Sequence, residues 1–277
     1  MPEQMITTSV GPLLVRDTDP GGARPTLLWH SLFVDSRSWE RVEPELARDR
    51  RLVVVTGPGH GPSGDPGHRY TMQDCADAAV AVLAEVGVDG PVDWVGNAWG
   101  GHVGIVLASR RPDLVRTLVT AGTPVHAYTR GGRLQTHLLL ALYRAFGPVR
   151  FLVDSVTDVL LSERTRERDA AAVALVRDSF ASADRRGLAN AVVSISLHRE
   201  DLTPALPSIQ APTLFITGSD HHDWSAEQAR AAARLVPHGS SVAVEGAAYL
   251  VPLETPAEFV RSVHGFWAEH AAPGVSP

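Results

Sequence analysis

Apolar runs of strand length alternate with longer amphipathic stretches along most of this chain. Parallel strands that are buried on both faces read as short continuous apolar runs, and the helices between them carry one apolar face. The strands predicted on this basis are 25–30, 51–55, 92–95, 114–119, 213–217 and 241–244. The helices predicted between them are 38–48, 72–86, 102–111, 226–235 and 256–270. The alternation predicts an α/β fold with a mostly parallel central sheet flanked by helices.

The alternation stops between residues 125 and 206, where no segment has the pattern of a strand. The helical stretches in this interval are 134–146, 151–161 and 169–183. A helical insertion after a strand is typical of a cap over the carboxyl edge of the sheet, where ligands bind. We therefore predict a core formed by 1–124 and 207–277 and a helical cap formed by 125–206.

A Gly-x-x-x-Gly turn lies between a predicted strand and a predicted helix, at Gly96-Asn97-Ala98-Trp99-Gly100. Strand, sharp turn and helix form the setting in which Gly-x-Ser-x-Gly presents a nucleophilic serine at the top of a sheet. Small flanking residues are needed there because the backbone is strained and the chains approach closely. The central residue is Ala98, whose methyl group cannot attack a carbonyl.

Four further segments occur in the order found in one large family. Residues 28–33 (LWHSLF) resemble its oxyanion loop and 57–63 (GPGHGPS) its glycine turn, while 217–220 and 246–256 resemble the loops that carry its catalytic acid and histidine. The chain thus resembles the α/β-hydrolase superfamily along nearly its whole length. The resemblance implies an α/β-hydrolase fold with an inserted helical cap.

The same resemblance implies that all three positions of a Ser-His-Asp triad have changed. Ala98 stands at the nucleophile position, Tyr249 at the histidine position, and His221 where the aspartate normally follows the glycine. Relative to position 221, where the family's aspartate usually stands, Asp220 lies one residue before and Asp223 two residues after. Because a triad works through contact between nucleophile, base and orienting acid, the usual mechanism is not available.

Two explanations of Ala98 remain open. An experimenter could have replaced a serine, or an aspartate of the epoxide-hydrolase type, which would fit Trp99 and the tyrosines Tyr128 and Tyr143 in the cap. Alternatively, the lineage lost nucleophilic catalysis, which accounts also for Tyr249 and His221.

An oxyanion hole survives such changes because it consists of backbone N–H groups. We expect these donors at Trp99 and Leu32, with Ser31, Asn97 and Tyr128 as further substrate contacts. Together with the following helix N-terminus, the donors could hold a carbonyl oxygen or an enolate. Proton abstraction, lyase chemistry or water attack would then be possible without a nucleophile.

The candidate acid–base groups are His30, His221, His222 and Tyr249. His30 lies in the oxyanion loop, where a histidine also commonly serves only to order the loop. Asp220 and Asp223 flank His221 and His222, so a carboxylate could orient one imidazole. Exposed loop histidines are the alternative. The hydroxyl of Tyr249 either donates a hydrogen bond into the pocket or fills the space of a lost imidazole.

Composition narrows the classes of partner and cofactor. The net charge of −6 on 277 residues, with no basic stripe, argues against nucleic acid. No apolar run is long enough to cross a membrane, and the single cysteine with no signal-peptide pattern favours a cytoplasmic protein. Lysine is absent, which excludes Schiff-base chemistry and a lysine-bound pyridoxal cofactor. Ligand-type spacing of histidines or cysteines is lacking, so neither a metal nor any other cofactor is expected.

Three functional hypotheses follow. The first is a cofactor-free enzyme acting on a small, largely apolar carbonyl- or ester-bearing molecule without a serine nucleophile. The second is a non-catalytic, ligand-binding pseudoenzyme or receptor. The third is an esterase, lactonase or epoxide hydrolase whose nucleophile has been replaced by Ala98. The substrate and the oligomeric state cannot be derived from the pattern.

Overall fold

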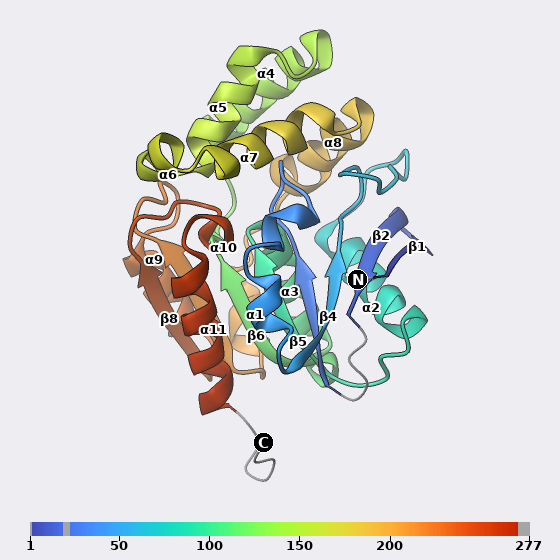
Figure 1. Ribbon diagram of the computed structural model, residues 1–277, viewed down its shortest axis with the longest axis vertical. Helices are drawn as coiled ribbons and strands as arrows, with labels where there is room; N and C mark the ends of the chain where they lie inside the picture. Colours follow the sequence, from blue (N-terminus) through green and yellow to red (C-terminus); the bar gives the residue numbers. More distant parts are fainter. Residues whose placement is uncertain (1, 19–22, 271–277) are drawn as a thin grey trace.

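The described parts of the computed structural model, residues 2–18 and 23–270, contain an eight-stranded sheet in the order β1-β2-β4-β3-β5-β6-β7-β8. Strands β3 to β8 are parallel to one another. Each lies where an apolar run predicted a strand: β3 Arg24–Trp29, β4 Arg50–Val55, β5 Val92–Asn97, β6 Val115–Ala121, β7 Thr213–Gly218 and β8 Gly239–Val244. The predicted α/β fold with a mostly parallel sheet is confirmed (Figure 1).

The sequence analysis missed an antiparallel hairpin at the edge of the sheet, formed by β1 (Glu3–Thr8) and β2 (Gly11–Asp17). In β1 only Ile6 is buried, so this edge strand carries little of the apolar signal that identified the inner strands. Strand β2 pairs antiparallel with β4 and joins the hairpin to the parallel strands.

Helices cover both faces of the sheet. One layer contains α2 (Met72–Glu85), α3 (Trp99–Arg110) and α9 (Ala226–Ala233); the other contains α1 (Glu43–Leu46) and α11 (Pro256–Glu269). Neighbouring residues of β3 point to opposite layers, so that Leu27 packs in the first core and Leu28 in the second. The helix predicted over 38–48 is instead a short 3-10 turn, η1 (Ser36–Trp39), followed by α1.

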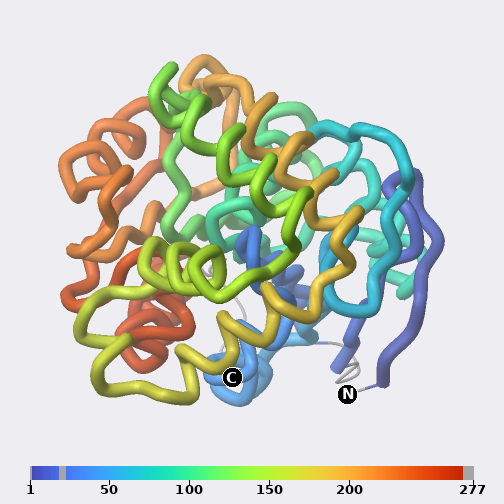
Figure 2. Tube along the Cα trace, turned by 90° about the horizontal axis from the view of Figure 1, so that it is seen from above, coloured from blue at the N-terminus to red at the C-terminus, as the bar shows by residue number. Residues whose placement is uncertain are grey.

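Helices of the interval predicted as a cap lie across the carboxyl ends of the parallel strands (Figures 1 and 2). They are α4 Arg130–Phe146, α5 Arg150–Leu160, α6 Glu163–Arg168, α7 Ala170–Ser182, α8 Arg185–Ala191 and the π-helical turn η3 Val192–Leu197. The short helices α6 and α8 were not predicted, because two turns give too few residues for a periodic pattern. The helices between β6 and β7 thus form a roof over the edge of the sheet where ligands bind in such folds.

Among the described helices, none combines the length and the hydropathy that crossing a membrane would require.

Candidate active site

The turn between β5 and α3 has the strained backbone of a nucleophile elbow. Ala98 has φ 47° and ψ −101°, a conformation that is unfavourable for any residue with a side chain. A Cβ at Gly96 would lie 2.2 Å from the carbonyl carbon of Gly100, and one at Gly100 would lie 1.9 Å from the carbonyl oxygen of Trp29. The two glycines are therefore required for the turn, which here presents a methyl group.

Two backbone N–H groups beside Ala98 have the environment of an oxyanion hole. Trp99 is the first residue of α3, where an N–H has no acceptor within the helix. In the described part of the chain, neither this N–H nor that of Leu32 donates to a backbone acceptor outside the helices and strands. Leu32, Trp99 and Ala98 all line one cavity. This placement is consistent with the donors expected from the sequence.

Tyr249, at the histidine position, forms a pair with Asp223. Its hydroxyl donates a hydrogen bond of 2.5 Å to Oδ2 of Asp223, and both residues line the cavity. Burial, followed by the nearby carboxylate, raises the pKa of Tyr249. The phenol therefore keeps its proton at neutral pH and acts as a hydrogen-bond donor, while the second oxygen of Asp223 is left to accept.

His221 lies behind Tyr249 rather than in the cavity wall. The two rings are stacked with their centroids 3.6 Å apart, and Nδ1 of His221 accepts a 3.2 Å hydrogen bond from the backbone N–H of Asp223. Burial lowers the pKa of His221 to about 4, so its ring is neutral at pH 7. His221 supports Tyr249 and the Asp223 loop, and this geometry gives no support to its role as an acid or base.

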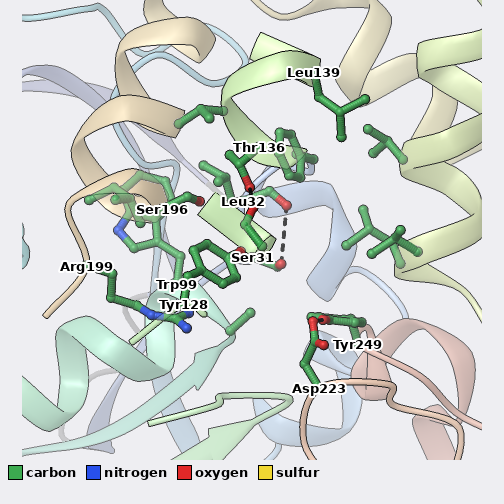
Figure 3. A pocket seen from close by; sticks show the side chains of 18 of the residues that line it. Ser31, Leu32, Trp99, Tyr128, Thr136, Leu139, Ser196, Arg199, Asp223 and Tyr249 are labelled. Carbon is green, nitrogen blue, oxygen red and sulfur yellow. Dashed lines mark hydrogen bonds between the residues drawn. The ribbon is translucent and has the colours of Figure 1, made fainter. Parts of the chain in front are cut away.

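His30 is fully buried and orders the oxyanion loop. Its Nδ1 donates to the carbonyl of Ser31 at 2.7 Å, and its Nε2 accepts from the N–H of Gly57 at 2.8 Å. With both nitrogens engaged and its side chain outside the cavity wall, His30 has no free position for proton transfer. The loop-ordering alternative is the one that fits. Ser31 lines the cavity and donates to the carbonyl of Leu32 at 3.2 Å (Figure 3).

The remaining predicted residues divide between the cavity and the structure around it. His222 and Tyr128 line the cavity. Asp220 is exposed, lies outside the cavity wall and accepts a hydrogen bond from Ser219. Asn97 donates to the carbonyls of Ala121 and Tyr249, which fastens the elbow to the loop of Tyr249. Asn97 and Asp220 therefore do not belong to the group of residues that a ligand in the cavity would touch.

The cavity has a volume of about 590 Å³ and extends from the elbow to the undersides of α4, α5 and α7. Its roof is largely apolar and comes from α4, α5 and α7, with Leu139, Leu140, Tyr143, Leu152, Val156 and Phe180. Figure 3 shows Ser31 and Leu32 in the middle of the view, Arg199 and Tyr128 on one side, and Tyr249 and Asp223 on the other. The size and lining suit a small, mainly apolar molecule with a few polar atoms.

Arg199 is a cavity residue that the sequence analysis did not identify. It follows the apolar stretch that forms η3, and its guanidinium carbon lies 4.6 Å from the centroid of the Tyr128 ring. Arginines are common along the cap segment, so composition could not distinguish this one from the exposed Arg130 and Arg133. Its position just after an apolar stretch was the only sequence feature that could have indicated that this arginine is buried.

Within residues 2–18 and 23–270, no three histidine, cysteine, aspartate or glutamate side chains are grouped so that they could hold a metal ion.

Comparison with known proteins identifies relatives in sequence and in structure. Residues 26–262 match the model of a family described as "Alpha/beta hydrolase family". The chain is 26% identical over 253 residues to pyrrolizixenacetamide deacetylase of Xenorhabdus hominickii, which covers 89% of this chain and 92% of that protein. It is 22% identical over 253 residues to (E)-2-((N-methylformamido)methylene)succinate hydrolase of Acinetobacter baylyi, with 91% and 92% covered. Its structure resembles a thermophilic esterase of Thermogutta terrifontis with a TM-score of 0.90, 24% identity, and 98% and 100% of the two chains covered.

Proposed function

Because the chain belongs to the alpha/beta hydrolase family, whose relatives include hydrolases of small molecules, we propose that it acts on a small carbonyl-bearing molecule without a nucleophilic side chain. One observation carries the proposal. The elbow and its two N–H donors are retained at the cavity, while the triad positions hold Ala98, His221 and the Tyr249 that is bonded to Asp223. An acyl-enzyme cannot form on Ala98, so the chemistry must use the oxyanion hole in another way.

The N–H groups of Trp99 and Leu32 stabilise negative charge that develops on a carbonyl oxygen. Donors fixed by the backbone need no reorganisation during the reaction, and one such donor contributes several kcal/mol in a dry site. The N-terminus of α3 adds its positive end at the same place. A bound ketone or ester is therefore activated for loss of a proton from the carbon next to its carbonyl.

Asp223 is the base in this proposal, and Tyr249 holds it in position. The free lone pairs of the carboxylate accept the proton from the substrate carbon, and the electron pair of the broken C–H bond moves to the carbonyl oxygen. The resulting enolate is held by the two N–H groups until the proton returns or a bond β to the carbonyl breaks. The Tyr249 hydroxyl stays protonated throughout and keeps its 2.5 Å hydrogen bond to Asp223.

Exchange of substrate protons with solvent tests this proposal directly. Ketones and β-keto esters with apolar substituents are incubated in D2O with the protein, and loss of the α-proton signal is followed by NMR. We expect saturable exchange above the buffer rate, and Asp223→Asn should reduce it by about 10²- to 10⁴-fold. Asp220→Asn is the matched control, because Asp220 is an exposed carboxylate of the same loop outside the cavity wall.

Two outcomes contradict the proposal. Exchange that Asp223→Asn leaves unchanged would place the base elsewhere. Saturable binding without any exchange would leave ligand binding alone as the function, in agreement with the pseudoenzyme hypothesis. Tyr249→Phe distinguishes the positioning role of Tyr249 from the role of Asp223 as the base. It should slow exchange less than Asp223→Asn does, because the carboxylate remains.

A further inference from the structure

Arg199 places a buried positive charge in the wall of the cavity. Only 8% of the residue is exposed, and its side chain lines the same cavity as Ala98 and the oxyanion donors. Burial, the main influence, lowers the pKa of Arg199, but a guanidinium remains charged at neutral pH in spite of this. A charge in this position requires compensation, because removing an ion from water is costly.

The protein satisfies only part of the hydrogen-bonding capacity of this guanidinium. Nη2 donates to the carbonyl of His126 at 2.7 Å, and Nε has no partner within the described residues. Nη1 lies 3.4 Å from Nε2 of His102, but that nitrogen also lies 2.8 Å from the carbonyl of Pro124 and is better placed to donate there. Nε is shielded within the protein, so the N–H groups that Arg199 has left for a ligand in the cavity are those of Nη1 and the second N–H of Nη2.

No carboxylate of the described chain lies within 4.0 Å of Arg199. Asp223 and Asp201 act on it only over a longer distance, and Asp223 already accepts a hydrogen bond from Tyr249. The Tyr128 ring gives a cation–π contact, which is weaker than an ion pair and leaves the charge unneutralised. Buried arginines in proteins are normally paired with an anion, so the missing partner is a feature of the site.

We infer that Arg199 is the anion-binding end of the cavity and that the ligand is a small organic acid with an apolar body, held through its carboxylate. This inference rests on the proposed function and gives its substrate class. A guanidinium matches a carboxylate in geometry, and the pairing is strong when both are desolvated. A single positive charge neutralises a monoanion, whereas a phosphate dianion would leave excess negative charge in a cavity that also contains Asp223.

The positions of the charges also orient the ligand. Asp223 repels the carboxylate, which therefore lies toward Arg199 and Tyr128, on the other side of the cavity (Figure 3). The carbonyl that reacts would lie at the N–H groups of Leu32 and Trp99, between these two sides. The apolar body would extend under Leu139 and Val156 in the roof. Such a molecule presents its α-carbon to Asp223 and its charge to Arg199.

Binding of matched acids and amides tests the inference. The probes are octanoate, 4-phenylbutanoate and 6-phenylhexanoate, each compared with its primary amide by isothermal titration calorimetry at pH 7.5. We expect the wild-type protein to bind each acid at least about tenfold more tightly than the amide, as a buried charge-assisted hydrogen bond implies. Arg199→Gln should remove this preference by weakening acid binding, with the amide affected by less than about twofold. Arg199→Lys should retain part of the preference, since it keeps the charge but loses the planar fork.

Arg133→Gln is the control, because it removes one positive charge from an exposed position of the cap outside the cavity wall. It should leave the preference for acids unchanged. Without ligand, Arg199→Gln should melt at or above the temperature of the parent, because it removes an uncompensated buried charge. A large fall in melting temperature would show Arg199 to be a structural residue and would overturn the inference.

The remaining outcomes separate this inference from the proposed function. Equal binding of acids and amides by the wild-type protein would overturn the anionic subsite, while binding of carbonyl compounds in the cavity would still stand. Failure of every acid and every amide to bind would also overturn the inference, and the exchange experiment in D2O would then decide the proposed function on its own. The wild-type comparison needs no variant, so the inference can be rejected even if Arg199→Gln does not fold.

Discussion

At residue 98 the strained backbone of a nucleophile elbow is kept although the residue has nothing to present. The φ of 47° at Ala98 costs folding free energy, on the order of 1–3 kcal/mol for such conformations. The strain still has a purpose if the turn is needed for its N–H groups, since the position of Trp99 at the start of α3 depends on it. The turn thus keeps the backbone N–H of Trp99 at the cavity although it presents no nucleophile there.

Restoring a serine at this position should not restore a hydrolase. In Ala98→Ser the hydroxyl would enter the cavity that Tyr249 also lines, and Tyr249 is a protonated phenol that already donates to Asp223 and cannot accept a proton. We expect neither hydrolysis of p-nitrophenyl esters nor fluorophosphonate labelling. The triple variant Ala98→Ser, Tyr249→His, His221→Asp should raise ester hydrolysis by about 10²- to 10⁴-fold, the range of general-base catalysis.

The double variant Tyr249→His, His221→Asp is the control. It retains Ala98, so any ester hydrolysis that it shows does not depend on a serine at position 98. Turnover and labelling by Ala98→Ser alone would contradict the prediction. That result would mean that some other group serves as its base and that Ala98 is a single replaced nucleophile, as the third hypothesis from the sequence holds.

At the residue scale the sequence placed backbone groups at the cavity better than it placed imidazoles. Leu32 and Trp99 line the cavity as expected, because the motifs fix where these residues lie in the chain; their role as donors stays a prediction. His30 and His221 were candidates because of their loops and, for His221, its neighbouring aspartates, but side-chain direction decides whether a histidine meets the cavity or the core. The Tyr249–Asp223 bond and the buried charge of Arg199 join residues far apart in sequence, so no local pattern could reveal them.

At the scale of elements, the strand that carries the elbow is anchored by a buried ionic cluster. Asp93 of β5 is 1% exposed and accepts hydrogen bonds from Arg50, from Arg116 at 3.1 Å and from Thr117 at 2.7 Å. The Arg50 guanidinium carbon also lies 4.0 Å from the centroid of the Trp267 ring in α11. One carboxylate thus ties β5 to β4 and β6 at the end opposite to the site.

Asp93→Asn should destabilise the fold by roughly 3–5 kcal/mol, because it leaves the buried Arg50 charge with only the 3.8 Å contact to the exposed Asp49. Urea unfolding followed by circular dichroism measures the loss. Asp113→Asn is the matched control: Asp113 pairs with Arg111 on the surface, where water screens the interaction, and no measurable change is expected. A fall of less than about 1 kcal/mol for Asp93→Asn would show that the cluster is not a significant source of stability.

The inner strands and long helices were predictable because burial on both faces, or on one face, leaves a repeated apolar signal. The errors occurred where this signal is weak: the edge hairpin of β1 and β2, in which at most alternate residues are buried, the short helices α6 and α8, and the turn η1. In η1 the apolar Trp39 is buried against α11 rather than along a helix of its own. Tertiary packing determines the secondary structure of such segments, and a local sequence pattern carries no information about that packing.

At the scale of the whole molecule, four neutral histidines are buried in the core and around the site. Burial, the main cause in each case, lowers the pKa of His60 and of His102 to about 3, that of His221 to about 4, and that of His30 below its ordinary value. In the unfolded chain the same rings titrate near 6.5. The unfolded state therefore binds more protons than the folded state between pH 6.5 and about 4.

It follows that stability rises with pH in this window and is lost as the pH falls below 6.5, by up to about 1.4 kcal/mol per pH unit for each histidine. Urea unfolding at pH 7.5, 6.5, 5.5 and 4.5 measures the slope. His102→Gln should reduce the slope of stability against pH by up to about 1.4 kcal/mol per pH unit, the contribution of one titrating group. His68→Gln is the control at an exposed position and should leave the slope unchanged. The carboxylates of Asp35 and Asp169, whose pKa values arginine partners lower, add to the loss from about pH 5 downward, while Glu43, whose pKa burial raises, acts in the opposite direction. Both contributions are the same in the His102→Gln and His68→Gln variants, so the comparison of the two isolates the histidine. A stability that stays constant from pH 7.5 to 4.5 would mean that these rings become charged without unfolding, and that the interior is wetter than its packing indicates.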